Sequence, residues 1–541
     1  MPLGELVVEI SVDYCLTTGN PLLASAFDAD GNGFVDADAS GRLISGFQIA
    51  IDSGDGIKGA AEGQVFTSNG ELLFTDTSTS KPATIPVGIV DGSGNSVSIG
   101  GNGNIEASAE ALGSSQSKNT TGDNNAFGSV FGAGATLIGN VNIGGEGNVT
   151  GTSRVGITAG EDAAFTTSGY NTATLVDANG LINNPSTTSA IDTDSSTTTG
   201  STSANNNLLS IGLGTSAVRL ASPLTGNAGE GDLSTSSIPL AGPASITVGT
   251  DGNVEGVARN IASADSKTTT GPAVAFTGGL TTDGGNTFAF DPLQVRDAGI
   301  TGTGVTAAQL SGGSALGADQ GNALTVGIFN MDVTGGGSHD EGSGTNTVLG
   351  DGVSVFNTSS SSTTGDVRAG SSAITAGIFG ADLSSGSLQN TKIKVGRNGT
   401  AEGYADSVNT SSSATVTGDS TTANASTTSA IANVNLDLGN DVDVTVRATS
   451  ADRVSSKATT GDVVGASNIS TTGLLNSDVN IGNNGGVSAI ASALNEVKVN
   501  TITGNATATS VANVVAIENT PIFIGGNGSL SASASMTSTV G

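Results

Sequence analysis

The sequence is almost without large aromatic side chains: its 541 residues include no tryptophan, 3 tyrosines and 15 phenylalanines. Such a chain has to build its core from small and β-branched side chains. Its single cysteine, Cys15, excludes any disulfide within the chain. Charged residues make up only 12% of the sequence, which does not fit the low-hydrophobicity, high-charge composition of disordered proteins.

Basic residues are scarce as well. Lys and Arg number 17 against 48 Asp and Glu, which gives a net charge of -31 at pH 7. Nucleic acid is therefore excluded as a partner, because its phosphates require a basic surface. No run of about 18 consecutive apolar residues occurs, so we expect no membrane-spanning helix. A chain of 541 residues is too long for one compact core, which favours several domains or one elongated repeat structure.

Glycine is abundant, with 82 residues, and one phrase around it recurs. The stretches LDLGNDVDVTVRAT, VNIGNNGGVSAIAS and IFIGGNGSLSASAS begin at Leu436, Val479 and Ile522, 43 residues apart. Aliphatic residues stand one and three positions before the glycine, and alternation resumes after it, which predicts a strand, a tight turn and a second strand. The phrase is found at Gly100, Gly144, Gly249, Gly396, Gly439, Gly482 and Gly525.

Two positions after this glycine, most copies carry Asn or Asp, usually followed by another glycine. This is turn chemistry, because these residues tolerate positive φ. Stacked copies would align the side chains in a hydrogen-bonded ladder along the stacking axis. The predicted ladder residues are Asn102, Asp251, Asn398, Asp441, Asn484 and Asn527.

A second marker, a Thr-Gly pair, divides the repeat close to its midpoint. Thr417-Gly418 lies midway between Gly396 and Gly439, and Thr460-Gly461 lies midway between Gly439 and Gly482. We therefore predict an all-β fold, an elongated parallel β-solenoid (β-helix) with about 21–22 residues per coil and a 43-residue double repeat. Aliphatic columns are expected to fill its interior. A single wide coil that takes the whole repeat stays open as an alternative.

Composition divides the chain into two regions. Residues 1–95 show longer aliphatic alternation and are predicted to form a small N-terminal β-domain or cap. Residues 96–541 form the predicted solenoid, irregular with loop insertions over about 150–390 and regular over 390–541. The stretch SSSSTT, residues 359–364, is expected to be a loop or an exposed turn.

An acidic stretch, FDADGNGFVDAD, lies within the N-terminal region. Its alternating oxygen-bearing residues around a central glycine resemble an EF-hand or dockerin calcium loop. The resemblance implies a structural Ca²⁺ ion, with a solvated acidic turn as the alternative. The implied ligands are Asp28, Asp30, Asn32, Asp36 and Asp38.

Catalytic residues are hard to find in the sequence. His339 is the only histidine, and nothing around it predicts a base with an oriented nucleophile. The carboxylate pairs Asp192/Asp194 and Asp340/Glu341 could serve glycoside cleavage, but sugar sites generally need aromatic platforms. We therefore expect a protein that is not an enzyme.

The repeat region as a whole resembles the Gly/Ala/Ser/Thr/Asn-rich β-solenoid proteins of bacterial surfaces, among them filament subunits and adhesins. The phrase GNGNIEA is also somewhat similar to curlin repeats, although the stacked glutamines of curlin are absent from these columns. The resemblance implies a fibre-forming habit and an extracellular or cell-surface location.

The last repeat is complete, and no capping helix, proline cluster or charged edge follows it, whereas natural proteins normally cover such edges. We therefore predict a filament subunit that polymerises head-to-tail with copies of itself, the N-terminal region covering the C-terminal coil by strand addition or coil stacking. Two alternatives stay open. One is an adhesin or passenger domain that binds cell-surface polysaccharide or cells, and the other is a tailspike-like polysaccharide-degrading enzyme.

Overall fold

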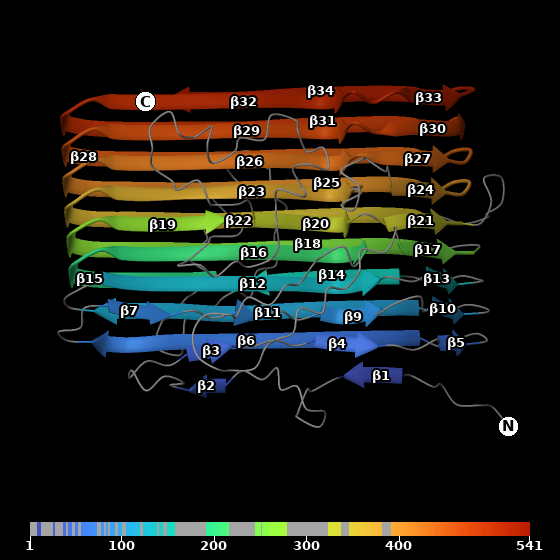
Figure 1. The fold of residues 1–541 in the computed structure, drawn as a ribbon. Helices are drawn as coiled ribbons and strands as arrows, with labels where there is room; N and C mark the ends of the chain where they lie inside the picture. Colours follow the sequence, from blue (N-terminus) through green and yellow to red (C-terminus); the bar gives the residue numbers. More distant parts are fainter. Residues whose placement is uncertain are drawn as a thin grey trace.

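The fold is a stack of β-strand layers, with the first described strand near one end of the stack and the C-terminus at the other (Figure 1). The computed structural model describes backbone strands from Val8–Ser11 onward, and it describes side chains within 195–213, 245–249, 252–277, 323–336, 346–380 and 391–541. Strands and turns account for these residues, and none of the described residues is helical. The expectation of an all-β protein is confirmed for this part of the chain.

The strands form three sheets. The first sheet contains β1 (Val8–Ser11), β6 (Gly56–Leu72), β11 (Asn104–Asn119), β14 (Val149–Gly156), β15 (Ile191–Thr199), β18 (Asn253–Thr270), β22 (Thr347–Thr364), β25 (Thr400–Thr417), β28 (Asp443–Thr460), β31 (Gly486–Thr503) and β34 (Ser529–Val540). The third sheet contains β5 (Ile49–Ile51), β10 (Ser96–Ile99), β13 (Asn140–Ile143), β17 (Ala244–Val248), β21 (Met331–Gly335), β24 (Thr391–Val395), β27 (Val434–Leu438), β30 (Asp478–Asn483) and β33 (Ile522–Gly525).

The second sheet runs beside the first. Its main path contains β2 (Ser25–Phe27), β3 (Asp36–Asp38), β8 (Ala83–Thr84), β12 (Asp123–Leu137), β16 (Thr202–Thr215), β19 (Ala273–Gly278), β23 (Val367–Phe379), β26 (Ser420–Ala432), β29 (Val463–Leu475) and β32 (Ala506–Glu518). Shorter strands complete it: β4 (Arg42–Ser45), β7 (Thr77–Ser80), β9 (Val87–Asp91) and β20 (Ala323–Phe329). The β2–β3 pair is antiparallel, and the strands of the repeat region pair in parallel.

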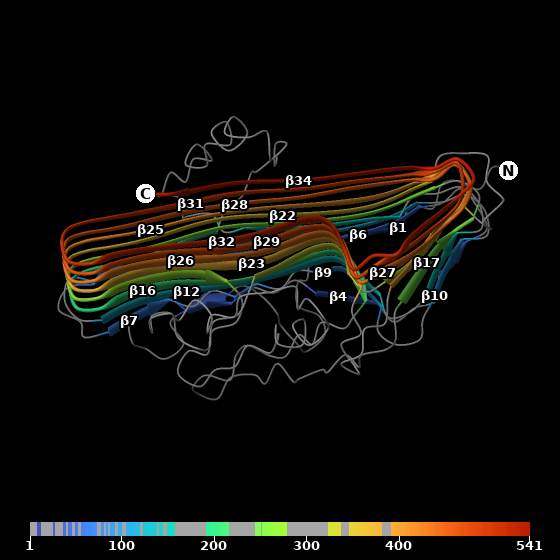
Figure 2. The ribbon, with the colours of Figure 1, turned by 90° about the horizontal axis from the view of Figure 1, so that it is seen from above.

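The chain visits the three sheets in the same order in each layer of the regular region. It runs along β25, β26 and β27 and returns to the first sheet as β28, where Thr400 pairs with Asp443. The same spacing of 43 residues joins Ser420 to Val463 in the second sheet and Asp419 to Asp462 beside it. One layer therefore takes 43 residues, and successive layers follow nearly the same path when seen from above (Figure 2).

The prediction of two coils in each 43-residue repeat was wrong. Strands pair with the strand one whole repeat away, as expected for the alternative of a single wide coil. The two repeat markers are two corners of one layer. Gly418 is the corner between the first and second sheets, whereas the phrase at Gly439 is the corner between the third sheet and the first. Strands that lie half a repeat apart in the sequence therefore belong to different sheets and are not stacked neighbours.

The Thr-Gly corner requires glycine. Gly461 has a φ of 133°, a conformation that side-chain-bearing residues rarely adopt. A Cβ atom at Gly461 would lie 2.0 Å from the backbone oxygen of Gly418 in the layer below. The corner glycine is thus fixed both by its own backbone conformation and by the close approach of the next layer.

Between β18 and β25 the layers take more residues than in the regular region. Thr347 of β22 pairs with Thr400 of β25, and Asn253 of β18 pairs with Thr347, so each step along the first sheet is longer than a regular repeat. The strands of residues 1–95 belong to the same three sheets, since β6 pairs in register with β11 and β5 pairs with β10. The boundary predicted at residue 95 therefore does not separate two sets of sheets.

An aliphatic cluster fills the interior where the three sheets meet. Leu436 and Leu438 of β27, Val444 of β28, Leu474 of β29 and Ile481 of β30 belong to one buried cluster that runs through the layers. These side chains come from alternate positions of each strand, which is the pattern that the sequence predicted for a buried face. Figure 2 shows the short strands of the third sheet, among them β17 and β27, at this end of the layer.

Small polar side chains fill the rest of the interior, between the two long sheets. Inward positions of β25 carry Ser407, Asn409, Ser411 and Ser413, all buried, so the aliphatic columns predicted to fill the interior occupy only the part near the third sheet. The stretch SSSSTT is also not a loop: residues 359–364 end strand β22, and the buried hydroxyl of Ser360 donates to the carbonyl of Ala273 at 2.8 Å. Hydroxyl and amide side chains can line a dry interior because each can find a hydrogen-bond partner in the facing strand.

Candidate assembly interface

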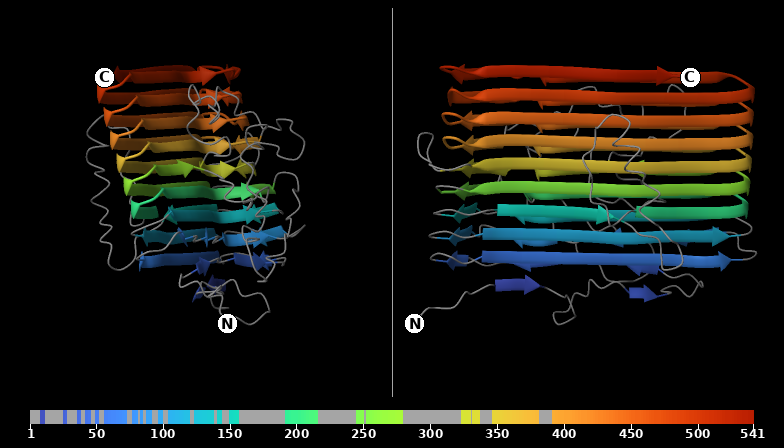
Figure 3. Two further views of the ribbon diagram at one scale, coloured as in Figure 1. Left: turned by 60° about the vertical axis from the view of Figure 1, so that its left-hand side comes forward. Right: turned by 180° about the vertical axis from the view of Figure 1, so that it is seen from behind.

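Among the strands that the structure describes, the layer formed by β32, β33 and β34 has neighbours on one side only. β32 pairs with β29, β33 with β30 and β34 with β31, and each stands at the end of its sheet. The backbone N–H groups of Ser529 and Gly541 donate to carbonyls of the β31 layer, at 3.1 and 3.0 Å. Because N–H groups alternate in direction along a strand, those of the even-numbered residues between them face away from β31. This end of the stack, shown in Figure 3, therefore presents an open strand edge.

Inward positions that are buried in the two layers below are exposed in this one. The inward column Val444–Val487–Leu530 has exposed fractions of 1%, 2% and 58%. Met536 and Val540 of the same strand are 54% and 53% exposed. The exposed fraction differs because of the position in the stack and not because of the residue type. One further layer in register would cover these side chains as β34 covers β31.

Apolar residues also replace polar ones near this end. Ser411 of β25 stacks below Val454 of β28, and the column continues through Val497 to Val540. This column is thus apolar at the open end, which favours its burial against another surface.

The end layer carries almost no charge. Residues 505–541 include one charged residue, Glu518, in a chain whose net charge is -31. At its corners stand the amides Asn505, Asn519 and Asn527. The backbone N–H of Asn505 donates to Asp462 at 2.8 Å, and Asn519 donates its side-chain amide to Asn476 at 2.9 Å. Covering this layer would therefore require little desolvation of charge.

A charged cluster lies on the outer face of the first sheet, away from the end layer. Arg447 of β28 donates to Asp406 of β25 at 3.0 Å, and its guanidinium lies 5.6 Å from the centre of the Tyr404 ring. Tyr404 in turn donates its hydroxyl to Glu402 at 3.0 Å. The ion pair connects two neighbouring layers, so the cluster acts as a clamp between them.

Burial dominates the protonation of this cluster. Loss of hydration raises the pKa of Asp406 to about 6, and the nearby Arg447 guanidinium only partly offsets it. Burial likewise raises the pKa of Asp351, against the attraction of Arg259, which lies 3.6 Å away. The Tyr404 pKa rises to about 12 through burial and its bond to the Glu402 carboxylate. Within the part of the chain that the structure describes, these side chains contact one another, and the ion pairs between layers stabilise the stack.

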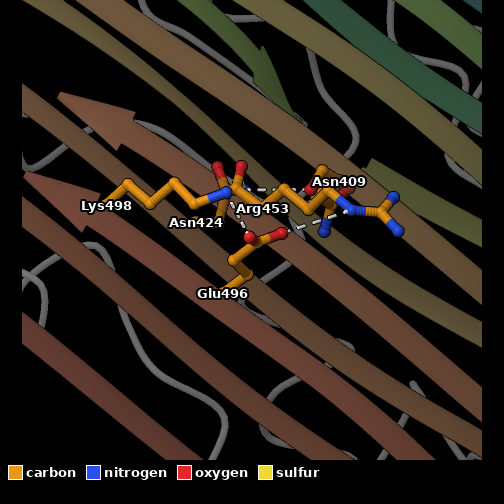
Figure 4. Close-up of polar contacts among 5 residues, drawn as sticks. All are labelled: Asn409, Asn424, Arg453, Glu496 and Lys498. Atoms are coloured by element: carbon orange, nitrogen blue, oxygen red, sulfur yellow. Dashed lines mark hydrogen bonds and ion pairs between the residues drawn. The ribbon is translucent and has the colours of Figure 1, made fainter. Parts of the chain in front are cut away.

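Amide side chains connect the two long sheets from inside (Figure 4). Asn424 of β26 donates to the backbone carbonyls of Asn409 and Arg453, each at 3.3 Å, and so bridges two layers of the first sheet. The Arg453 side chain points outward and pairs with Glu496 of the next layer at 3.7 Å, and Glu496 also pairs with Lys498. Interior amides and exterior ion pairs thus stabilise the same stack.

The predicted turn-ladder residues occupy one corner of the described layers. Asn398, Asp441 and Asn484 have φ values of 59°, 58° and 57°. In the end layer the positive φ falls on Gly526, and the N–H of Asn527 donates to the side chain of Asn484 at 3.4 Å. Asn102 and Asp251 lie outside the described residues.

The other predicted site residues are described only in part. Asp36 and Asp38 lie in β3, which pairs with β2, while Asp28, Asp30 and Asn32 lie outside the described residues. Calcium binding by this stretch stays a prediction. Among the residues whose side chains are described, no group of three His, Cys, Asp or Glu could hold a metal ion.

The residues considered for catalysis are also described only in part. Asp192 and Asp194 lie in β15, where they pair with Ser263 and Asp265 of β18, and their side chains are not described. His339, Asp340 and Glu341 lie outside the described residues. Sequence reasoning did not single out the Arg447 cluster or the polar interior, although the inward Ser, Thr and Asn follow the same alternation as the aliphatic positions.

A scan against protein-family models, a search of curated proteins and a search of solved structures each gave no match to this chain. In the described part of the chain, no helix is long and apolar enough to cross a membrane.

Proposed function

We propose that this chain is the structural subunit of an extracellular or cell-surface filament, a parallel β-solenoid that polymerises head-to-tail. Support for the solenoid comes from the fixed order in which the regular layers visit three parallel sheets and from the constant register between those layers. Support for an extracellular fibre comes from the resemblance of the repeats to bacterial surface proteins and from the acidic, repelling sides of the molecule.

One observation carries the proposal: Leu530 is 58% exposed at a position that is 1–2% exposed in the two layers below. Burying a side chain of this kind contributes about 1.5–3 kcal/mol. Met536 and Val540 add to the same surface, and the open N–H and C=O groups of three strands add directional pairing. The end layer is thus suited to bind another parallel layer.

A second copy of this chain is the occupant that the sheets favour. At the opposite end of the stack, β1 and β5 each pair with one neighbour among the strands that the structure describes, so within this part of the chain the first and third sheets each end on a strand with one paired side. Joining opposite ends of two copies keeps all strands parallel and uses two different surfaces. Such a contact does not close on itself and therefore gives a filament.

The test places one charge on the end layer and another on the side of the molecule. Leu530→Lys puts an ammonium on the surface that the next copy would bury, whereas Val416→Lys changes a comparably exposed residue, 48% exposed, on the side of β25. We expect the wild-type protein and Val416→Lys to form filaments by negative-stain microscopy and sedimentation velocity, and Leu530→Lys to remain monomeric.

The effect of added salt distinguishes assembly through the end layer from association that is driven by attraction between charges. The end layer is nearly uncharged while the body carries a net charge of -31, so added salt should screen repulsion between copies and promote assembly. A wild-type protein that stays monomeric at high concentration, in high salt and with or without calcium, would overturn the proposal. Filaments of Leu530→Lys as long as those of the wild type would overturn the assignment of the end layer.

A further inference from the structure

One carboxyl group lies at the centre of the polar interior. Asp452 of β28 faces the second sheet and is 0% exposed. Its two oxygens accept hydrogen bonds from the Asn409 amide at 3.2 Å, from the Ser426 hydroxyl, and from the Ser467 hydroxyl at 3.0 Å. These donors come from β25 in the layer below, from β26 and from β29.

No positive charge compensates this carboxyl group. Of the elements packed around it, β25 contributes Asn409, β26 contributes Ser426, β29 contributes Ser467 and β31 contributes Asn495. None of these side chains is titratable, and among the described residues no cationic group forms a hydrogen bond or an ion pair with Asp452. A buried carboxylate without a cation is costly, and neutralisation by a proton relieves that cost.

The layer above offers an acceptor for such a proton. Asn495 of β31 pairs in register with Asp452 and is 0% exposed, so the two side chains stack at about the 4.8 Å spacing of neighbouring strands. The Asn495 amide nitrogen donates to the backbone carbonyl of Val511 at 3.1 Å, while its side-chain oxygen has no hydrogen-bond partner in the structure. A carboxylate has only lone pairs to offer to that oxygen, whereas a protonated carboxyl has an O–H to donate.

We propose that Asp452 is a proton-operated lock between two layers: in its neutral form it donates its O–H to the side-chain oxygen of Asn495 and so holds β31 on β28. The step is a simple protonation, in which a proton from solvent binds the carboxylate and no other bond is made or broken. The inference concerns the interior of one chain and does not depend on filament formation.

The pH range follows from the burial of the group. Loss of hydration raises the pKa of Asp452 to about 6 from its ordinary value of 3.8, and it outweighs the three hydrogen bonds that favour the charged form. The folded state therefore binds more protons than the unfolded state between these values. The stabilisation is fully present below about 3.8 and is lost as the pH rises through about 6.

Asp452→Asn tests the lock, because an amide N–H can donate to Asn495 at every pH. Urea unfolding followed by circular dichroism is the readout, since urea does not screen charge. For the wild type we expect an unfolding equilibrium constant lower at pH 4.5 than at pH 7.5 by on the order of 10-fold. That difference should shrink in Asp452→Asn and persist in Asp478→Asn, a matched loss of an exposed carboxylate on β30.

Asn495→Ala tests the acceptor and covers the case in which Asp452→Asn does not fold. Without the acceptor the neutral acid loses its partner, so the midpoint of the stability-against-pH profile should move to lower pH. Asn500→Ala, at an exposed position of the same strand, should leave that midpoint unchanged. An Asp452→Asn variant with the full wild-type pH dependence, or an Asn495→Ala variant with the wild-type midpoint, would overturn the proposal.

Discussion

The two halves of the layer interior are filled in different ways. Near the third sheet, Leu436, Leu438 and Ile481 form an aliphatic cluster in which each side chain only has to exclude water. Between the two long sheets, Asn424 and Asp452 sit among hydroxyls and amides and depend on particular partners. The first half tolerates changes of shape that keep the volume, whereas the second tolerates few changes of chemistry. The comparison predicts how each half responds to substitution.

The largest effect should come from a cavity in the aliphatic half. Leu436→Ala removes a fully buried side chain of β27 and should destabilise the protein by about 2–5 kcal/mol. Leu436→Met keeps the volume and should cost less than about 1.5 kcal/mol. Urea unfolding of the two variants measures the difference. Equal losses for both would show that this half also depends on more than volume.

The polar half should respond to the loss of partners. Asn424→Leu keeps the size of the side chain but removes an acceptor for Ser371 and Ser411 and a donor to two backbone carbonyls. Unsatisfied buried groups should then cost about 1–3 kcal/mol. Thr421→Ala, at an outward position of the same strand, is the control. If Asn424→Leu were as stable as the wild type, the interior amides would not be needed for the fold.

A smaller effect should come from Asp406 on the outer face. Its pKa is raised to about 6 by burial, so it favours the folded state most below the ordinary aspartate pKa of 3.8, and that contribution disappears as the pH rises through about 6. Asp406→Asn should remove on the order of 1 kcal/mol from the difference in stability between pH 4.5 and pH 7.5. Urea unfolding at both pH values measures it, and an unchanged difference would assign the pH dependence to other groups.

The smallest effect should come from exposed ion pairs between layers. Lys394 and Asp437 lie 3.6 Å apart on the outer face of the third sheet, with side chains 52% and 38% exposed. Lys394→Ala should therefore cost roughly 0.2–1 kcal/mol, and less in high salt. Urea unfolding at low and high salt checks this, and a larger, salt-independent loss would mean that the lysine stem contributes packing.

Aliphatic periodicity allowed the strands and one corner to be predicted from the sequence. The alternating pattern around Gly439 and Gly482 predicted strands on both sides of a turn, and Asn484 has the positive φ expected of such a turn. The aliphatic pattern could not determine the number of residues in one coil. The two turn motifs of a repeat have the same spacing whether the strands between them stack in one sheet or face each other in two sheets. The backbone pairing distinguishes these cases.

The polar interior was missed for a chemical reason. Serine, threonine and asparagine are common in exposed turns, so a run such as residues 359–364 is typical of a loop when it is considered alone. In the structure the same run ends β22, and its inward hydroxyls donate to the backbone carbonyls of Ala273 in the second sheet and of Gly271 at the corner before it. The partners lie 87 or more residues away along the chain, so local composition gives no indication of them.

Hydrogen exchange along β34, resolved residue by residue, is the most direct measurement of end-to-end assembly. In dilute protein, amides that bond to β31, such as those of Ser529 and Gly541, should be protected, and the even-numbered amides from Leu530 to Val540 should exchange freely. At concentrations where filaments form, the even-numbered amides should become protected too, because a second copy supplies their acceptors. Filaments in which these amides still exchange as in the monomer would contradict the account.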